Sequence, residues 1–171
     1  MSDIYKKVSE KELSLLSHKD CVRFALFCAE QVRDSWKDIP ECVAAIETAE
    51  RWLEGKATEE ECVNAADAAA SAAVNAADAA ASAAANAADA AAYAASHAAT
   101  ADAYYATYAA DAADAYANAT SSAAYAAYVA YYACAAGGFS SQLVIKEQRE
   151  YYNELLHFDD IAERALLGTS G

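Results

Sequence analysis

Nine tyrosines gather in the second half of a long alanine-rich stretch, and their rings are the side chains best suited to bind a ligand. Eleven residues separate Tyr93 from Tyr104, and four separate Tyr104 from Tyr108, so rings on a helix would stand in rows. Rigid rings between small alanine walls can stack on a planar ligand such as a nucleotide base. The same rings can instead fill gaps between alanine helices while their hydroxyls reach water. The nine are Tyr93, Tyr104, Tyr105, Tyr108, Tyr116, Tyr125, Tyr128, Tyr131 and Tyr132.

Polar groups elsewhere would complete such a site. His97 lies close in sequence to the first of these tyrosines and can bond a ligand or titrate near neutral pH, or it can mark a helix end. The phosphates of a nucleotide would need Arg23, Lys146 or Arg149, because the alanine-rich stretch contains no cation. The predicted ligand-binding residues are Tyr93, His97, Tyr104, Tyr105, Tyr108, Tyr116, Arg23 and Arg149.

No arrangement of nucleophiles, bases or metal ligands in the sequence points to catalysis. His18 and Cys21 are spaced one helical turn apart, but they lack a third group to orient the base. Glu154 and His157 have the Glu-x-x-His spacing of di-iron bundles, yet the chain has no second copy of that pair. His18, Cys21 and Cys28 do not have the spacing of a zinc site. We therefore expect a protein that is not an enzyme and that holds no metal or cofactor.

The alanine-rich stretch that carries the tyrosines is expected to be helical and to fold back on itself. Residues 62–136 include 42 alanines in 75 positions, and no Gly or Pro interrupts the stretch. Alanine is the best helix former, and one helix of this length would be about 112 Å long, far longer than a compact domain. Turn-forming residues occur only at 96–102 and 118–122, so we predict turns there.

An eleven-residue repeat beginning at Asn64, Asn75 and Asn86 places one polar stripe along this helical stretch. Alanine covers the rest of the perimeter, so we expect close packing against two or more neighbouring helices. The repeat resembles that of type I antifreeze proteins, but those carry threonine where this chain has asparagine. Ice binding is therefore not expected.

The chain is strongly acidic, with a formal net charge of −14 at pH 7. Residues 57–144 contain nine acidic residues and no Lys or Arg. Such a surface repels nucleic acid and anionic membranes, so we expect neither as a partner. Two interpretations of the charge remain open: it keeps an alanine-rich protein soluble, or it attracts a basic protein partner.

Cysteine usage and the first residues favour a cytoplasmic protein. The five cysteines are odd in number and fall on predicted apolar faces, which fits reduced thiols better than a disulfide framework. The charged opening of the chain does not have the pattern of a signal peptide. Residues 115–145 are uncharged and long enough to cross a bilayer, but they contain several polar side chains, so we expect no membrane span.

Helix start and stop signals surround the alanine-rich stretch. Ser9 with Glu12 has the spacing of a capping box. Pro40 suits the first position of a helix, and Gly55 suits the residue after a helix end. A further capping box, Thr58-Glu-Glu-Glu61, opens the alanine-rich stretch, and paired glycines at 137–138 close it. The helices expected outside that stretch span 9–16, 17–36, 40–53, a segment from Ser140 or Ser141 to about 156, and 160–167.

No alternating strand pattern occurs, so the fold class is predicted to be all-α, a compact multi-helix bundle with close-packed alanine-rich helices. The length fits a single domain over 1–171. Within it we expect amphipathic helices over 1–56, alanine-rich helices over 57–136 and C-terminal helices over 137–171.

Two segments near the start of the chain carry a family resemblance. The stretch from Cys21 to Val32 and the stretch from Ala49 to Thr58, which contains Trp52, resemble the opening of an alanine-rich immunity protein family of bacteria and phages. In that family a long run of alanine punctuated by tyrosine and aspartate follows, and the resemblance covers about residues 17–155. It implies a protein that neutralises a toxin or a defence effector, and it implies no catalytic residues.

The residues and the resemblance together favour a non-catalytic binding protein of the immunity or phage anti-defence type. Its acidic surface would cover a basic protein toxin or effector. Alternatively, the tyrosines would form a pocket, across an oligomer interface, that sequesters a nucleotide-derived signal. A structural or oligomerisation module is a third interpretation, because exposed alanine faces associate readily, and a homo-oligomer is compatible with all three.

Overall fold

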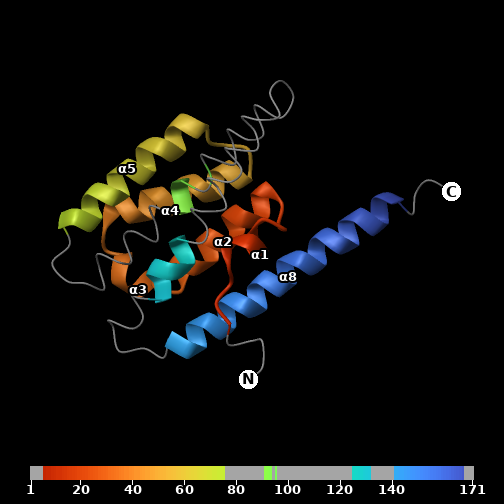
Figure 1. Cartoon of the computed structure of the whole chain (residues 1–171). Coiled ribbons are helices and arrows are strands. Elements are labelled where there is room, and N and C mark those ends of the chain that lie inside the picture. Colours follow the sequence, from red (N-terminus) through yellow and green to blue (C-terminus); the bar gives the residue numbers. More distant parts are fainter. Residues whose placement is uncertain (1–5, 76–90, 94, 96–124, 132–140, 168–171) are drawn as a thin grey trace.

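The computed structural model describes residues 6–75, 91–93, 95, 125–131 and 141–167, without the side chains of 35, 73, 141 and 158–167. The described part is helical and contains no strand, which confirms the all-α prediction. Its helices pack into a bundle from which one long helix, α8 (Ser141–Leu167), extends (Figure 1). The turns predicted at 96–102 and 118–122, the glycines at 137–138 and Cys134 lie outside the described residues.

The predicted caps at the start of the chain are present. Helix α1 (Glu10–Leu13) begins with a capping box, in which the Ser9 hydroxyl accepts the N–H of Glu12 at 3.3 Å. The Glu12 carboxylate accepts the N–H of Ser9 at 2.9 Å in return. Helix α2 (His18–Glu30) begins after Ser17, whose hydroxyl accepts the N–H of Asp20 at 3.2 Å. Short-range hydrogen bonds therefore set both helix starts, as the sequence predicts.

One helix was predicted over 17–36, and the structure corrects this. Helix α2 ends at Glu30, and a separate short helix, α3 (Arg33–Trp36), follows Val32, whose backbone is not helical. The break allows the buried Trp36 indole to donate a hydrogen bond to the Ala29 carbonyl at 2.8 Å. In a continuous helix these two residues would lie about 10 Å apart along the axis, too far for that bond.

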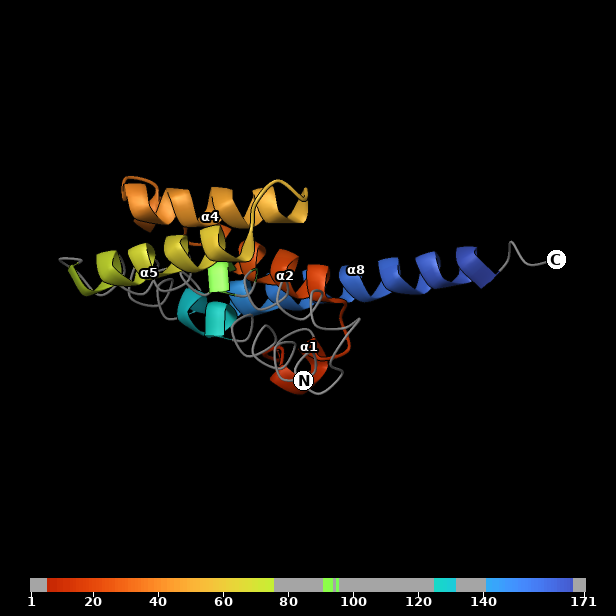
Figure 2. The same ribbon diagram turned by 90° about the horizontal axis from the view of Figure 1, so that it is seen from above.

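Helices α4 (Pro40–Leu53) and α5 (Glu59–Asn75) pack side by side (Figure 2). Helix α5 forms the described start of the alanine-rich region. Helix α4 begins at Pro40, as predicted. It ends before Gly55, which takes a φ of 73°, and the N–H of Lys56 then donates to the Arg51 carbonyl at 2.8 Å. This is a Schellman-type end, which favours glycine because a side chain is strained at positive φ.

Helix α5 starts with the predicted capping box. The N–H of Thr58 donates to the Glu61 carboxylate at 2.8 Å, and the N–H of Glu61 donates to the Thr58 hydroxyl at 3.2 Å. The face that α5 buries is made of small side chains, Cys62, Ala66 and Ala69. Small residues let neighbouring helix axes approach closely, which agrees with the expected close packing of alanine helices.

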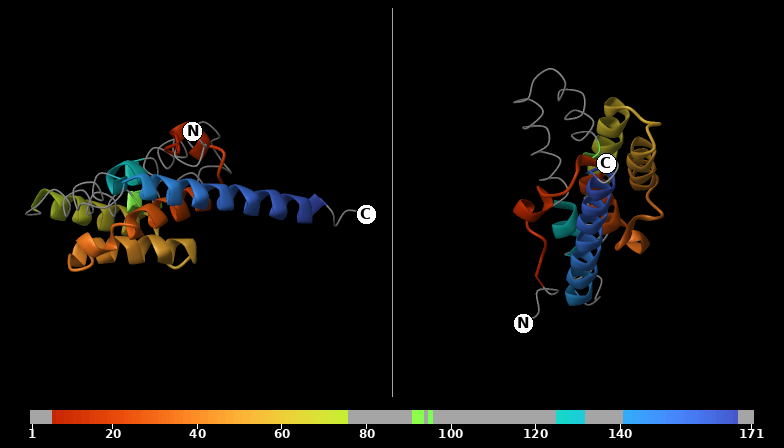
Figure 3. Two further views of the ribbon diagram at one scale, coloured as in Figure 1. Left: turned by 90° about the horizontal axis from the view of Figure 1, so that it is seen from below. Right: turned by 90° about the vertical axis from the view of Figure 1, so that its right-hand side faces the viewer.

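Helix α2 lies at the centre of the described bundle, between α4 and α8 (Figures 2 and 3). Most of its residues are buried, and Phe24 is among the largest fully buried side chains. The rings of Phe24 and Tyr152 on α8 meet in a T-shaped arrangement, with ring centroids 6.4 Å apart and planes at 83°. Packing against α2 therefore turns the α8 face that carries Tyr152 toward the core.

Helix α8 also differs from its prediction. Two helices were expected, one ending near 156 and one over 160–167, but the structure has a single helix of 27 residues. No Gly or Pro occurs between its ends, so nothing in its backbone chemistry forces a break. A helix of this length spans about 40 Å. Its first half crosses α2, and its second half extends beyond the bundle (Figure 3).

The four described cysteines are buried, in agreement with their predicted apolar faces. Burial raises the pKa of the Cys28 thiol well above its ordinary value and that of Cys62 to about 11, so both thiols stay protonated near neutral pH. Among the described residues, none of the helices combines the length and the apolar character needed to cross a membrane.

Candidate functional site

Of the six tyrosine and histidine positions predicted to bind a ligand, only Tyr93 is described. Its ring is half-buried and packs against the core, and its hydroxyl donates a hydrogen bond to the Asp67 carboxylate on α5. This contact holds the segment around Tyr93 against α5. The others, His97, Tyr104, Tyr105, Tyr108 and Tyr116, lie outside the described residues.

Arg23, one of the three candidate phosphate ligands, lies on the surface of α2. Its guanidinium bonds the Asp20 carboxylate at 2.6 Å, one turn earlier in the same helix. The Asp20 side chain is buried, whereas that of Arg23 is about half exposed. The pair therefore stabilises the start of α2 and leaves part of the guanidinium facing solvent.

Arg149, another of the three candidate phosphate ligands, is a buried structural residue. Its guanidinium donates to the Glu12 carboxylate, with a shortest distance of 2.5 Å. It also donates to the carbonyls of Lys6 at 3.2 Å and Lys7 at 2.8 Å. These bonds use four of its five N–H groups. The bonds from Arg149 to Glu12, with those from Ser9, hold the Glu12 pKa at about 2. Arg149 ties the N-terminal segment to α8, an arrangement that leaves little capacity for a phosphate.

Two exposed tyrosines form an aromatic surface patch on the helical segment over 125–131. The rings of Tyr125 and Tyr128 are nearly parallel, with centroids 6.4 Å apart, and each side chain is about half exposed. The Lys7 ammonium lies 3.8 Å from the centroid of the Tyr131 ring and 5.9 Å from that of Tyr128. Sequence reasoning missed this cation because Lys7 precedes the tyrosines by more than one hundred residues.

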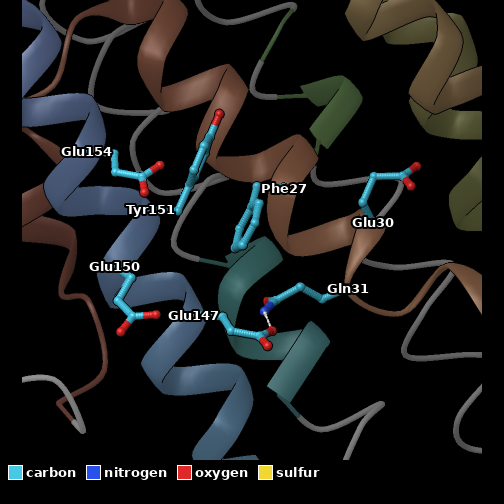
Figure 4. Close-up of a pocket in the computed structure, with 7 residues that line it drawn as sticks. All are labelled: Phe27, Glu30, Gln31, Glu147, Glu150, Tyr151 and Glu154. Carbon is cyan, nitrogen blue, oxygen red and sulfur yellow. Dashed lines mark hydrogen bonds between the residues drawn. The ribbon is translucent and has the colours of Figure 1, made fainter.

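The candidate site of the described part is an open groove of about 430 Å³ between α2 and α8 (Figure 4). The residues that line it from the α2 side are three and four positions apart, and those from α8 are three, four and seven positions apart. These are the spacings of one helix face, so each helix lines the groove with a single face. Four of the seven side chains are glutamates. The lining residues, called here the α2/α8 groove, are Phe27, Glu30, Gln31, Glu147, Glu150, Tyr151 and Glu154.

Two stacked aromatic rings form the apolar part of the groove. Phe27 and Tyr151 lie almost parallel, with ring centroids 4.3 Å apart and planes at 17°. Both side chains are half-buried, so part of each ring remains accessible. Burial raises the pKa of the Tyr151 phenol; the Arg23 guanidinium opposes the rise, and the Asp20 and Glu154 carboxylates add to it. The phenol therefore stays neutral and acts as an aromatic surface with a polar tip.

The four glutamates differ in how strongly the protein engages them. Gln31 donates to Glu147 at 3.0 Å, and Arg33 pairs with Glu30 at 2.9 Å. Lys146 approaches Glu150 only to 3.5 Å. Within the described residues, the Glu154 carboxylate makes no hydrogen bond or ion pair, which leaves Glu150 and Glu154 most able to bind a cation.

Gln31 is held in place by a second glutamine. The buried Gln148 amide donates to the Gln31 side chain at 3.0 Å and to the Ala127 carbonyl at 3.3 Å. This small network joins α2, α8 and the segment over 125–131, and it makes that end of the groove rigid. The described residues contain no group of three or more His, Cys, Asp or Glu placed to hold a metal ion.

Sequence reasoning did not find this groove. A signal was present, because Glu147, Glu150 and Glu154 repeat at helical spacing around Tyr151. Nothing in the sequence indicated that Phe27 and Glu30 would face them from α2.

Comparison with protein-family models, with curated proteins and with solved structures finds no match to this chain. The resemblance to an immunity protein family therefore stays a prediction, and arguments about function depend on the geometry described above.

Proposed function

We propose that this protein is a non-catalytic binding protein that neutralises a basic protein effector, of the toxin or defence-factor type, by covering it with the α2/α8 groove. The observation that supports this proposal is the combination of four glutamates and an accessible aromatic pair in one open groove. Protein interfaces commonly join an aromatic centre to a polar rim in this way.

The charge of the chain supports the same partner chemistry. A formal net charge of −14 repels acidic proteins and attracts basic ones over about a Debye length, roughly 8 Å at physiological salt. The glutamates of the groove would then orient the partner, while the rings exclude water at the centre. Binding of this kind would hide the functional surface of the partner and needs no chemical step.

The proposal is tested by recovering proteins bound to the chain from cells that contain its effector, and then measuring the purified pair. One variant carries Glu150→Gln with Glu154→Gln in the groove. The control carries Glu47→Gln with Glu50→Gln on the exposed face of α4, which lies across α2 from α8 (Figure 3). Both variants change the net charge equally.

We expect a basic partner whose activity is inhibited by the wild-type chain and by the control. The groove variant should bind it about tenfold more weakly. If no basic protein is inhibited, or if both variants lose affinity equally, the proposal fails.

A second candidate function, a pocket that sequesters a nucleotide-derived signal, is favoured by the exposed Tyr125 and Tyr128 rings beside Lys7. Rings and a cation are the groups that a base and a phosphate need. Mass spectrometry of small molecules released from the same purified protein decides between the two functions. A stoichiometric nucleotide without a bound protein would favour the pocket.

A further inference from the structure

The α2/α8 groove places negative charge directly beside an accessible aromatic surface. Tyr151 stands between Glu150 and Glu154 on α8, and Phe27 stacks on it from α2 (Figure 4). A cation that enters the groove therefore meets ring and carboxylate together. A lysine ammonium and an arginine guanidinium would use these two surfaces differently.

The carboxylates of α8 are placed so that they repel one another and destabilise the helix that carries them. Glu150 and Glu154 are four residues apart, and Glu147 lies three residues before Glu150, so like charges occupy neighbouring positions on one helix face. Such pairs repel each other and destabilise a helix. Within the described part, the ion pair with Lys146 at 3.5 Å partly offsets this repulsion at Glu150, and no cation pairs with Glu154. A cation from a partner would remove the repulsion, and its binding would gain accordingly.

The aromatic pair favours a planar cation. A guanidinium is flat, weakly hydrated and able to lie on a ring while its N–H groups point outward in its own plane. Those N–H groups can then reach carboxylates on both sides of the ring. An ammonium is compact and strongly hydrated, so it gains the charge attraction but loses most of the stacking.

We infer that the α2/α8 groove recognises an arginine side chain of its basic partner, with the guanidinium stacked at the Phe27–Tyr151 pair and its N–H groups bound by Glu150 and Glu154. This inference rests on the proposed function, because it specifies how that groove selects the partner. It makes arginine, rather than positive charge in general, the anchor of the complex.

The inference is tested with the full-length protein and two synthetic helical peptides. Both peptides have an alanine framework with three cationic residues on one face; one carries arginine and the other lysine at the same positions. Fluorescence anisotropy at low salt gives the two dissociation constants. We expect the arginine peptide to bind about tenfold more tightly than the lysine peptide.

Three variants locate the site. Glu150→Gln with Glu154→Gln should weaken binding of the arginine peptide about tenfold, whereas the control with Glu47→Gln and Glu50→Gln should bind it like the wild type. Phe27→Leu keeps an apolar side chain of similar size and should bring the affinity ratio of the two peptides close to one. Circular dichroism confirms that each variant is folded; if Phe27→Leu is not, the double glutamate variants and the wild-type ratio decide alone.

Equal affinities of the wild-type chain for the two peptides would overturn the arginine inference while leaving charge-driven capture of a basic protein intact. Unchanged binding by the groove variant, or failure of both peptides to bind, would overturn the location. Tight, arginine-selective binding without inhibition of any basic protein would instead contradict the proposed function alone.

Discussion

The α4–α5 pair and the α2–α8 pair bury side chains of opposite kinds. In the α4–α5 pair the buried side chains are mostly small, including Ala45 and Ala49 on α4 and Ala66 and Ala69 on α5. In the α2–α8 pair large rings meet instead, with Phe24 against Tyr152 and Phe27 against Tyr151.

The difference indicates where this protein can carry chemistry. Alanine faces bring helices close together, but they leave neither an accessible ring nor a charge at the contact. Large side chains meet where α2 and α8 pack, and the groove with its four glutamates is lined by these two helices. The α4–α5 pair therefore acts as a scaffold, whereas the α2–α8 pair provides the candidate binding surface.

The largest expected effect comes from removing a ring at the α2–α8 contact. Phe24→Ala should lower the free energy of unfolding by about 3 to 5 kcal/mol, because the side chain is fully buried and leaves a cavity. Urea denaturation followed by circular dichroism measures the change. Leu15→Ala is the control, since that side chain is 68% exposed and should change stability by less than about 0.5 kcal/mol. A loss below about 1 kcal/mol for Phe24→Ala would contradict the contrast between the pairs.

A smaller effect is expected from enlarging a side chain in the α4–α5 pair. Ala69 is fully buried on α5, so Ala69→Leu should lower the free energy of unfolding by about 1 to 3 kcal/mol through overpacking. The same substitution at the exposed Ala44 on α4 should leave the unfolding midpoint almost unchanged. If both variants are equally stable, the alanine faces are not closely packed.

The acid sensitivity of the Glu12–Arg149 pair gives a third, weaker test. The folded-state pKa of Glu12, about 2, is below its ordinary value of 4.5, so its contribution to stability is present above about pH 4.5 and is lost as the pH falls toward 2. Glu12 is partly exposed, so solvent screening keeps this contribution to about 1 kcal/mol or less. The difference in unfolding free energy between wild type and Glu12→Gln should therefore shrink from pH 6 to pH 2. A difference that is constant across this range would exclude the proposed origin.

The smallest expected effect lies in the groove itself. Glu154→Gln removes a like-charge neighbour of Glu150 and should raise the free energy of unfolding by about 0.2 to 0.5 kcal/mol in low salt. The same variant should bind the arginine peptide less tightly than the wild type does. A gain in stability together with a loss of binding would show that Glu154 serves binding, whereas Phe24 serves the packing of the core. Destabilisation by this substitution would instead mean that Glu154 supports the fold.

Predictions from sequence were accurate where the relevant partners are close in the chain. The capping boxes at Ser9 and Thr58 and the start at Pro40 depend on groups within a few residues, and all three are present. The break after Glu30 and the continuity of α8 were predicted wrongly. The break accompanies a bond from the Trp36 indole to the Ala29 carbonyl, a contact that the apolar spacing of 17–36 does not indicate. Helix α8 is continuous because no Gly or Pro interrupts it, so the expected division into two helices was wrong.

In the candidate site, too, sequence reasoning failed where the partners of a residue are distant in the chain. Its tyrosine part rested on repeat spacing, and of those residues only Tyr93 falls in the described part, where its ring packs against the core. Arg149 was expected at a phosphate, but a residue type alone cannot show that its partners are Glu12 and two carbonyls near the N-terminus. The groove was missed because its two faces come from distant segments.

The sequence by itself determined the all-α class, the acidic surface and most helix starts of the described part, because these depend on composition and on hydrogen bonds within about one turn. Only the tertiary structure decided that α8 lies against α2, which pairs Phe27 with Tyr151 and surrounds them with glutamates. Gln31 and Glu147, which meet in this groove, are 116 residues apart in the chain. No local spacing encodes such a contact; it follows from how the buried faces of whole helices fit together.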